Sequence, residues 1–235
     1  MIGVNQVSQM WLGLKQALNL LFSLDQEVYK IIMLSLSVSL TATFISSIIG
    51  APLGIFIGIK NFPFKRILVR LLYTMMSIPP VIAGLVVFLI ISRKGPFGYL
   101  GLVYTPAAMI IAQSCLITPI IMGIVYNGTK ERGSLIKALG KTLGASSGQA
   151  MLLLIRELRT NILSAVVTGY GRAVSEVGAV MIVGGNIKGH TRVMTTTIAM
   201  LQSMGDYSTA IAIGIVLLGI SFLINSILYH FQQGA

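Results

Sequence analysis

The chain has 235 residues, of which 55% are hydrophobic and only 10% are charged, and its formal net charge is +11. A soluble domain usually carries about 25% charged residues, so this composition excludes a soluble globule and favours lipid as the solvent. The basic excess contains no long Lys/Arg run and no aromatic RNA-binding motif. It therefore indicates the cytoplasmic loops of a membrane protein, and nucleic acid is not an expected partner.

The N-terminal segment, residues 1–30, is less apolar than the rest of the chain. Four apolar side chains recur in it at helical spacing between polar ones: Trp11, Leu14, Leu18 and Leu21. This pattern predicts an amphipathic helix that lies in the membrane interface, and a sixth, short span over residues 8–24 is the alternative. Asp25 is then placed to N-cap the first span. We expect no cleavable signal peptide, because the segment lacks a basic n-region and a small-residue cleavage site.

Residues 31–235 contain five apolar stretches, each longer than the roughly 20 residues that cross a hydrocarbon core. They are residues 31–59, 71–92, 102–126, 161–185 and 208–231. Their backbone must be helical, because lipid offers no hydrogen-bond partners. Prolines 52, 79, 80 and 119 predict kinks. No repeat or linker divides these residues, so we expect one all-α integral membrane domain of five transmembrane helices, preceded by the amphipathic segment.

Lys and Arg are distributed unequally between the two sides of this domain. The loops after the first and third spans share one side and together hold ten basic residues, against six on the other side. The positive-inside rule then places the N-terminus outside, the C-terminus inside and the loop 127–160 in the cytoplasm.

Few residues could carry catalysis. Cys115 is the only cysteine, and we expect it to be buried as a small apolar side chain within its span. The two histidines lack metal-ligand spacing and no nucleophile–base set is evident, so neither an enzyme nor a metal site is expected. Residues 184–191 resemble a P-loop, but His190 stands at the position of the lysine and no strand precedes it. ATP must then be used by another subunit.

The loop 127–160 is the largest feature outside the predicted spans. Leu135, Leu139 and Leu143 are one helical turn apart, with Lys137 and Lys141 on another face. This predicts a short amphipathic helix. Gly144 is placed to cap it, and a tight turn of small residues follows: Ala145, Ser146 and Ser147. Such a helix can lie on the membrane or insert into a groove of a cytoplasmic partner, and the residues alone leave both open.

The fourth span carries a polar stripe. Its members recur every four residues: Ser164, Thr168, Arg172 and Glu176. An ionisable pair at membrane depth is costly and usually faces a bundle interior or an aqueous cavity. One hypothesis is therefore a translocation path or gate, which would also include Ser175. The other is a structural ion pair that fixes helix packing.

Small residues recur at a spacing of four in the first and fourth spans. They include Ser35, Ser39, Thr43, Ser47, Gly50, Gly54 and Gly58, and Ala165, Gly169 and Ala173. Such patterns allow helices to approach closely, so we assign them to packing.

Residues 137–146, KALGKTLGAS, resemble the cytoplasmic EAA loop of ABC importer permeases. The match centres on residues 142–146, whereas Ala-Leu-Gly at 138–140 replaces the family's Glu-Ala-Ala. In that family the loop docks on the ATPase subunit. The resemblance therefore implies a set of coupling residues: Lys137, Ala138, Leu139, Lys141, Leu143, Gly144, Ala145 and Ser146.

Residues 171–189 are similar to the R-A-x-[GS]-E-x-G-A…G-N-I-x-G segment of oxyanion importer permeases, which serve molybdate, tungstate and sulfate. Residues 190–196 look most like the tungstate-type branch. Together with residues 50–54 and 78–84, the resemblance extends over residues 30–231.

This resemblance implies a type I ABC importer permease with a molybdate-permease-like fold, in the cell membrane of a prokaryote. It also implies a homodimer, two cytoplasmic ATP-binding subunits that use ATP and Mg, and an extracytoplasmic oxyanion-binding protein. No cofactor is expected in this chain. Tungstate is the favoured substrate, followed by molybdate, and a sulfate-type permease is the first alternative. The second alternative is a stand-alone carrier or channel, which would need no docking helix.

Overall fold

The computed structural model describes residues 26–233, and within this range the chain is helical with no strand. The predicted all-α class is therefore confirmed for the described residues. The predicted amphipathic helix, its rival span over residues 8–24 and the cap at Asp25 lie outside them.

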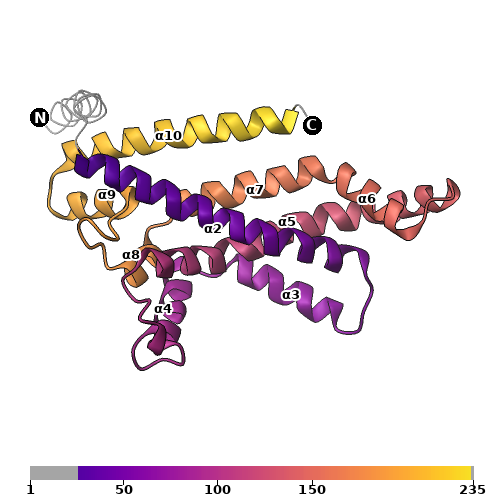
Figure 1. Cartoon of the computed structure of the whole chain (residues 1–235), viewed down its shortest axis with the longest axis horizontal. Coiled ribbons are helices and arrows are strands. Elements are labelled where there is room, and N and C mark those ends of the chain that lie inside the picture. Colours follow the sequence, from indigo (N-terminus) through magenta and orange to yellow (C-terminus); the bar gives the residue numbers. More distant parts are fainter. Residues whose placement is uncertain (1–25, 234–235) are drawn as a thin grey trace, which may run out of the picture.

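Three long helices form the body of the molecule: α2 (Gln26–Ile59), α5 (Pro106–Thr142) and α10 (Tyr207–Gln233). Each is long and apolar enough to cross a membrane, and together they match the first, third and fifth predicted spans. They run along the long axis of the molecule (Figure 1). Helices α2 and α5 continue through Pro52 and Pro119 without a break, as membrane helices allow when neighbouring groups satisfy the freed carbonyls.

The second and fourth predicted spans are each broken into two helices. Helices α3 (Lys65–Met76) and α4 (Pro80–Ile91) meet at 102°, and α7 (Arg159–Val174) and α8 (Gly178–Gly184) meet at 58°. The kink predicted at Pro79 and Pro80 lies at the first break, whereas no kink was predicted at the second. Pro80 occupies the first turn of α4, where its missing N–H costs nothing, and the fixed backbone of Pro79 turns the chain.

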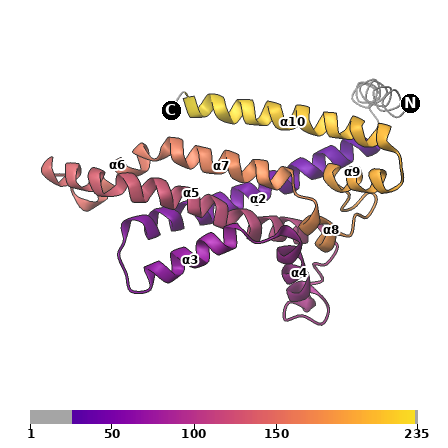
Figure 2. The ribbon, with the colours of Figure 1, turned by 180° about the vertical axis from the view of Figure 1, so that it is seen from behind.

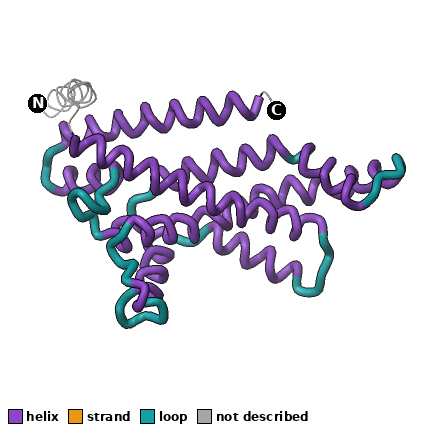
Figure 3. Tube along the Cα trace, in the orientation of Figure 1, coloured by secondary structure: helices purple, strands orange, loops and turns teal. Residues whose placement is uncertain are grey.

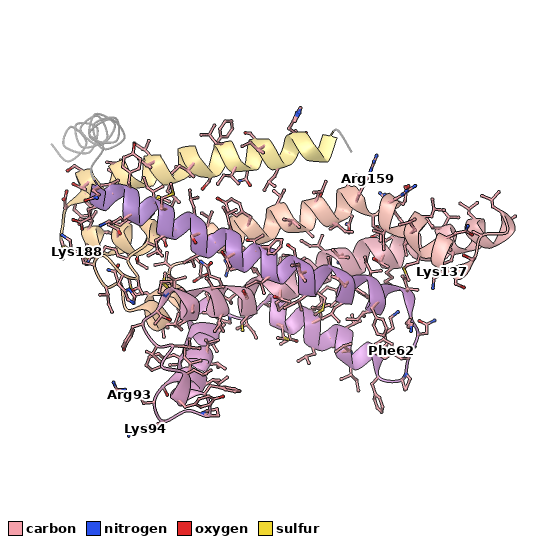
Figure 4. All side chains as sticks on the ribbon, viewed as in Figure 1. Phe62, Arg93, Lys94, Lys137, Arg159 and Lys188 are labelled. Atoms are coloured by element: carbon pink, nitrogen blue, oxygen red, sulfur yellow. The ribbon has the colours of Figure 1, made fainter. Side chains whose placement is uncertain are left out.

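Shorter elements complete the chain: η1 (Gly98–Leu100), α6 (Ser147–Glu157) and α9 (Met194–Ser203). Figure 2 shows from behind that α6 extends at one end of the long helices, whereas α8 and α9 lie at the other end. Figure 3 shows that longer loops gather at the α8–α9 end, around α4. In Figure 4, Lys137 and Arg159 lie toward the α6 end and Lys188 lies at the opposite end.

Helices α2 and α5 form the most extensive helix pair, and three glycines of α2 allow their close approach. A Cβ atom on Gly54 would lie 2.6 Å from the Met122 carbonyl oxygen, and one on Gly58 would lie 2.5 Å from Thr129. A Cβ on Gly169 of α7 would lie 2.8 Å from Ile121 of α5. These glycines have the packing role that the small-residue pattern predicted.

Cys115 is a correction to the predicted core. It lies on the exposed face of α5, while its neighbours Leu116 and Ile117 are buried. A span buries only part of its circumference inside the chain, so an apolar run does not tell which of its members face inward.

Candidate functional site

The residues predicted to couple to an ATPase lie at the tip formed by the end of α5 and the start of α6. The helix predicted over the leucines and the turn after it are present, but this helix is not short, because it is the end of α5, which continues unbroken from residue 106 to residue 142. Charged residues from Lys130 onward mark the end of the apolar stretch, but charge alone does not end a helix. The tip is thus a helical extension of a helix that is long and apolar enough to cross a membrane.

The turn at the tip is built by caps on both sides. Gly144 has φ of +74°, and the Ala145 N–H donates to the Gly140 carbonyl over 2.8 Å. This is the hydrogen bond of a Schellman motif, and it confirms the predicted cap at Gly144. Ser146 then begins α6 through a capping box, in which its hydroxyl accepts from the Gln149 N–H and its N–H donates to the Gln149 side chain over 2.8 Å.

The tip exposes a ridge of leucines. Leu135, Leu139 and Leu143 are 63%, 51% and 80% exposed. On the inner side Ile136 of α5 packs with the buried Leu154 and Leu158, which fixes the position of α6. Such a ridge on a defined scaffold is suited to a complementary apolar groove.

The other residues predicted to take part in coupling lie around this ridge. Ala138 and Ser146 are exposed, whereas Lys137 and Ala145 are half-buried. Lys141 belongs to α5 by its backbone.

A second candidate site lies where the two broken spans meet. Helix α4 packs on α8 directly after both breaks. A Cβ on Gly84 would lie 2.5 Å from the Ala179 Cα, and one on Gly178 would lie 2.8 Å from a methyl group of Val81. The two short helices therefore cross almost backbone to backbone.

Glu176 lies in the break between α7 and α8 and is only 5% exposed. Its Oε1 accepts from the Ala179 N–H over 3.1 Å, and its Oε2 is 3.9 Å from an Arg172 nitrogen. The Thr195 hydroxyl donates to the Glu176 carbonyl oxygen over 2.9 Å. The carboxylate thus satisfies the start of α8, and its charge is compensated both by that helix end and by the arginine.

The predicted polar stripe is only partly a shared face. Thr168, Arg172 and Ser175 are exposed, Ser164 is half-buried, and Glu176 turns inward because the helix ends at Val174. The spacing of four residues placed Glu176 on the same helix face as Arg172, but the sequence pattern does not show that the helix ends between them.

Sequence reasoning missed two residues that fasten this break. Gln113 of α5 is 4% exposed, and its Nε2 donates to the Ala173 carbonyl over 2.9 Å. Thr195 of α9 holds Glu176 through the hydrogen bond to its carbonyl oxygen. The sequence offered one signal for this contact. Gln113 is a lone amide within an apolar span, and a buried amide needs hydrogen-bond partners.

The comparisons with known proteins agree with this architecture. Residues 50–235 match the family model described as "Binding-protein-dependent transport system inner membrane component". The chain is 57% identical to a tungstate uptake system permease protein TupB of Peptoclostridium acidaminophilum, over 94% of this chain and 97% of that protein. It is 28% identical to the sulfate transport system permease protein CysW of Escherichia coli K12, over 79% of this chain and 65% of that protein.

A solved structure titled as an amino acid ABC transporter with histidines has a similar fold. Its TM-score is 0.66 at 16% sequence identity, and the alignment covers 92% of this chain and 97% of that one. This likeness shows that the two chains share their overall fold. The chain therefore belongs to the family of inner membrane components of binding-protein-dependent transport systems.

Proposed function

We propose that the chain is the membrane-spanning subunit of an ATP-driven, binding-protein-dependent importer of tungstate. The observation that carries the proposal is the 57% identity to a tungstate permease over nearly the whole of both chains. The sulfate permease is similar over a smaller share of its length and at 28% identity, which favours tungstate over sulfate.

The subunit would act as a homodimer with two cytoplasmic ATPase subunits and an extracytoplasmic binding protein. Its N-terminus would lie outside and the tip at residues 135–148 inside, as the distribution of basic residues favours. Leu139, Leu143 and Gly144 would contact the ATPase. When the ATPase subunits close on ATP, they would draw the two tips together and open the path to the outside.

The path would run along the exposed face of α7. Thr168 and Ser175 offer hydroxyl groups there, and Arg172, 42% exposed at its side chain, offers a positive charge. Glu176 is buried and is 3.9 Å from Arg172, so of the two charged groups only the guanidinium is exposed on this face. A dianion such as tungstate would be attracted to a face with this balance.

The decisive experiment places a bulky residue at the tip. Gly144→Trp in the full chain, co-expressed with the ATPase subunit, should abolish co-purification of the ATPase and tungstate uptake into vesicles, while membrane insertion persists. The matched control is Gly189→Trp. Gly189 has the same φ of +74° and, like Gly144, has no atom within 4 Å of the position that a Cβ would take, but it lies at the opposite end of the molecule.

Both variants carry the same backbone strain and the same added bulk, so only their position differs. The control should retain the ATPase subunit. Retention of the ATPase and undiminished uptake in Gly144→Trp would refute docking at the tip. Uptake without any ATPase subunit would favour the stand-alone carrier.

A further inference from the structure

A groove of about 920 Å³ lies between the α2–α3 corner and the last turns of α5. The α2–α3 corner is the segment of residues 60–64 that joins these helices. In Figure 4, Phe62 marks this corner and Lys137 projects from α5 on the side facing it. The groove is thus at the end of the molecule where the positive-inside rule places the cytoplasm.

The charge of the groove is one-sided. Five basic residues line it: Lys65, Arg66, Arg70, Lys130 and Lys137. No carboxylate is among the described residues that line it. Glu157 is 3.8 Å from Arg132, and neither residue lines the groove. Five cations without a counter-charge repel one another unless an anion binds among them.

The walls of the groove are held in place without a ligand. The Tyr73 hydroxyl donates to the Asn127 side-chain oxygen over 2.6 Å and joins α3 to α5. The Lys65 ammonium donates to the Lys60 carbonyl over 2.9 Å and ties the start of α3 to the end of α2. Ordering costs on binding are therefore small, because the groove is already formed.

The surroundings of the groove are those of a membrane interface. On α3 the apolar Ile67 and Leu71 are 60% and 53% exposed, beside the basic residues of the same helix. Phe64, at φ +68°, is 76% exposed at the corner. Within the groove, Val69 and Tyr126 add apolar surface. A free inorganic ion has no apolar surface to bury against this rim, whereas a lipid can bury its acyl chains against it.

We propose that this groove binds the phosphate headgroup of an anionic phospholipid from the cytoplasmic leaflet. The phosphate would lie among Arg66, Arg70 and Lys130, and the acyl chains would run along the apolar side of α3. Basic pockets between transmembrane helices on the cytoplasmic side are suited to such headgroups. Lys137 and Ala138 line the same groove, so the bound lipid would lie against the base of the tip.

The test measures lipid binding to the delipidated full-length protein in detergent, by native mass spectrometry. The probes are dioctanoyl-phosphatidylglycerol and, as the zwitterionic comparison, dioctanoyl-phosphatidylcholine. The wild type should bind the anionic lipid about tenfold more tightly. Arg66→Gln/Arg70→Gln should lose this preference, since each basic residue near a headgroup contributes to binding. Arg66→Lys/Arg70→Lys keeps the charge and should keep most of the affinity, which guards against misfolding as the cause.

The matched control is Arg156→Gln/Arg159→Gln, which removes two arginines outside the groove, on α6 and at the start of α7. It should bind the anionic lipid within twofold of the wild type. Equal losses in both double variants would reduce the effect to general charge and overturn the site. Competition by millimolar inorganic phosphate or tungstate would identify a free oxyanion as the ligand and overturn the lipid assignment.

Discussion

Glycine allows close approach in two helix pairs, α2–α5 and α4–α8, but the two contacts differ in extent. In the first pair, Gly50, Gly54 and Gly58 let two long helices contact over several turns. In the second, Gly84 allows two short helices to cross at Ala179 directly after their breaks. The first contact distributes its packing over many residues, and the second concentrates it at a crossing. Close approach can therefore fix a scaffold or create a local joint.

Valine substitutions at the two glycines should separate these roles. Gly54→Val and Gly84→Val introduce Cβ atoms at almost the same distance from a neighbour, 2.6 and 2.5 Å. We expect Gly54→Val to destabilise more, by about 3 kcal/mol or more, because α2 cannot shift without losing contacts along its length. Gly84→Val should cost about 1–2 kcal/mol, because α8 has only 7 residues and can move as a body.

The measurement is the thermal unfolding midpoint of monodisperse protein in detergent. Gly219→Val is the control, since nothing lies within 4 Å of a Cβ at that position on α10. Equal losses at Gly54 and Gly84 would show that the crossing is as rigid as the scaffold.

A double-mutant cycle on Arg172 and Glu176 tests whether this ion pair stabilises the break between α7 and α8 or takes part in transport. Glu176→Ala removes a buried acceptor from the Ala179 N–H and should destabilise by about 1–3 kcal/mol. Arg172→Ala removes an exposed partner at 3.9 Å and should change stability by less than about 1 kcal/mol while lowering tungstate uptake. Stability and uptake in reconstituted vesicles are measured for both single variants and the double variant. Full recovery of uptake in the double variant would eliminate the role of Arg172 in the path.

The smallest effect is expected from a pair of threonines. Thr195→Val deletes the hydrogen bond to the Glu176 carbonyl across the joint and should cost about 1 kcal/mol. Thr43→Val in the scaffold deletes only a bond to the Ser39 carbonyl four residues earlier in the same helix and should be nearly neutral. Chemical denaturation of both variants decides this, and a larger loss at Thr43 would reverse the comparison between joint and scaffold.

Hydropathy and length correctly predicted three helices that are long and apolar enough to cross a membrane, because the cost of burying charge in lipid is a property of composition. They could not predict the breaks with the same accuracy. Pro79 indicated the break between α3 and α4. At the break between α7 and α8, Ser175 and Val177 carry no comparable backbone restriction. That break is held instead by hydrogen bonds from Gln113 and Thr195, which are distant in sequence. Likewise, Lys130 marks the end of the apolar stretch, whereas the helix continues to its own cap.

The Gly144 cap and the Ser146 capping box follow local rules of sequence spacing, which a single sequence displays. The predicted cap was confirmed for that reason. Which side of a helix faces inward is decided by neighbours far away in sequence, and Cys115 was misplaced for that reason.

The continuity of α5 has a mechanical consequence. Its 37 residues form a rod of roughly 55 Å from the tip to the opposite end of the molecule. At that far end Met109 packs against Gly184 of α8, and the Tyr104 N–H just before the rod donates to the Val183 carbonyl over 2.9 Å. If α5 tilts as one body about the tip, a tilt of roughly 5° sweeps the far end by roughly 5 Å. One continuous helix thus connects the tip with the contacts that hold α8, the short helix beyond the break.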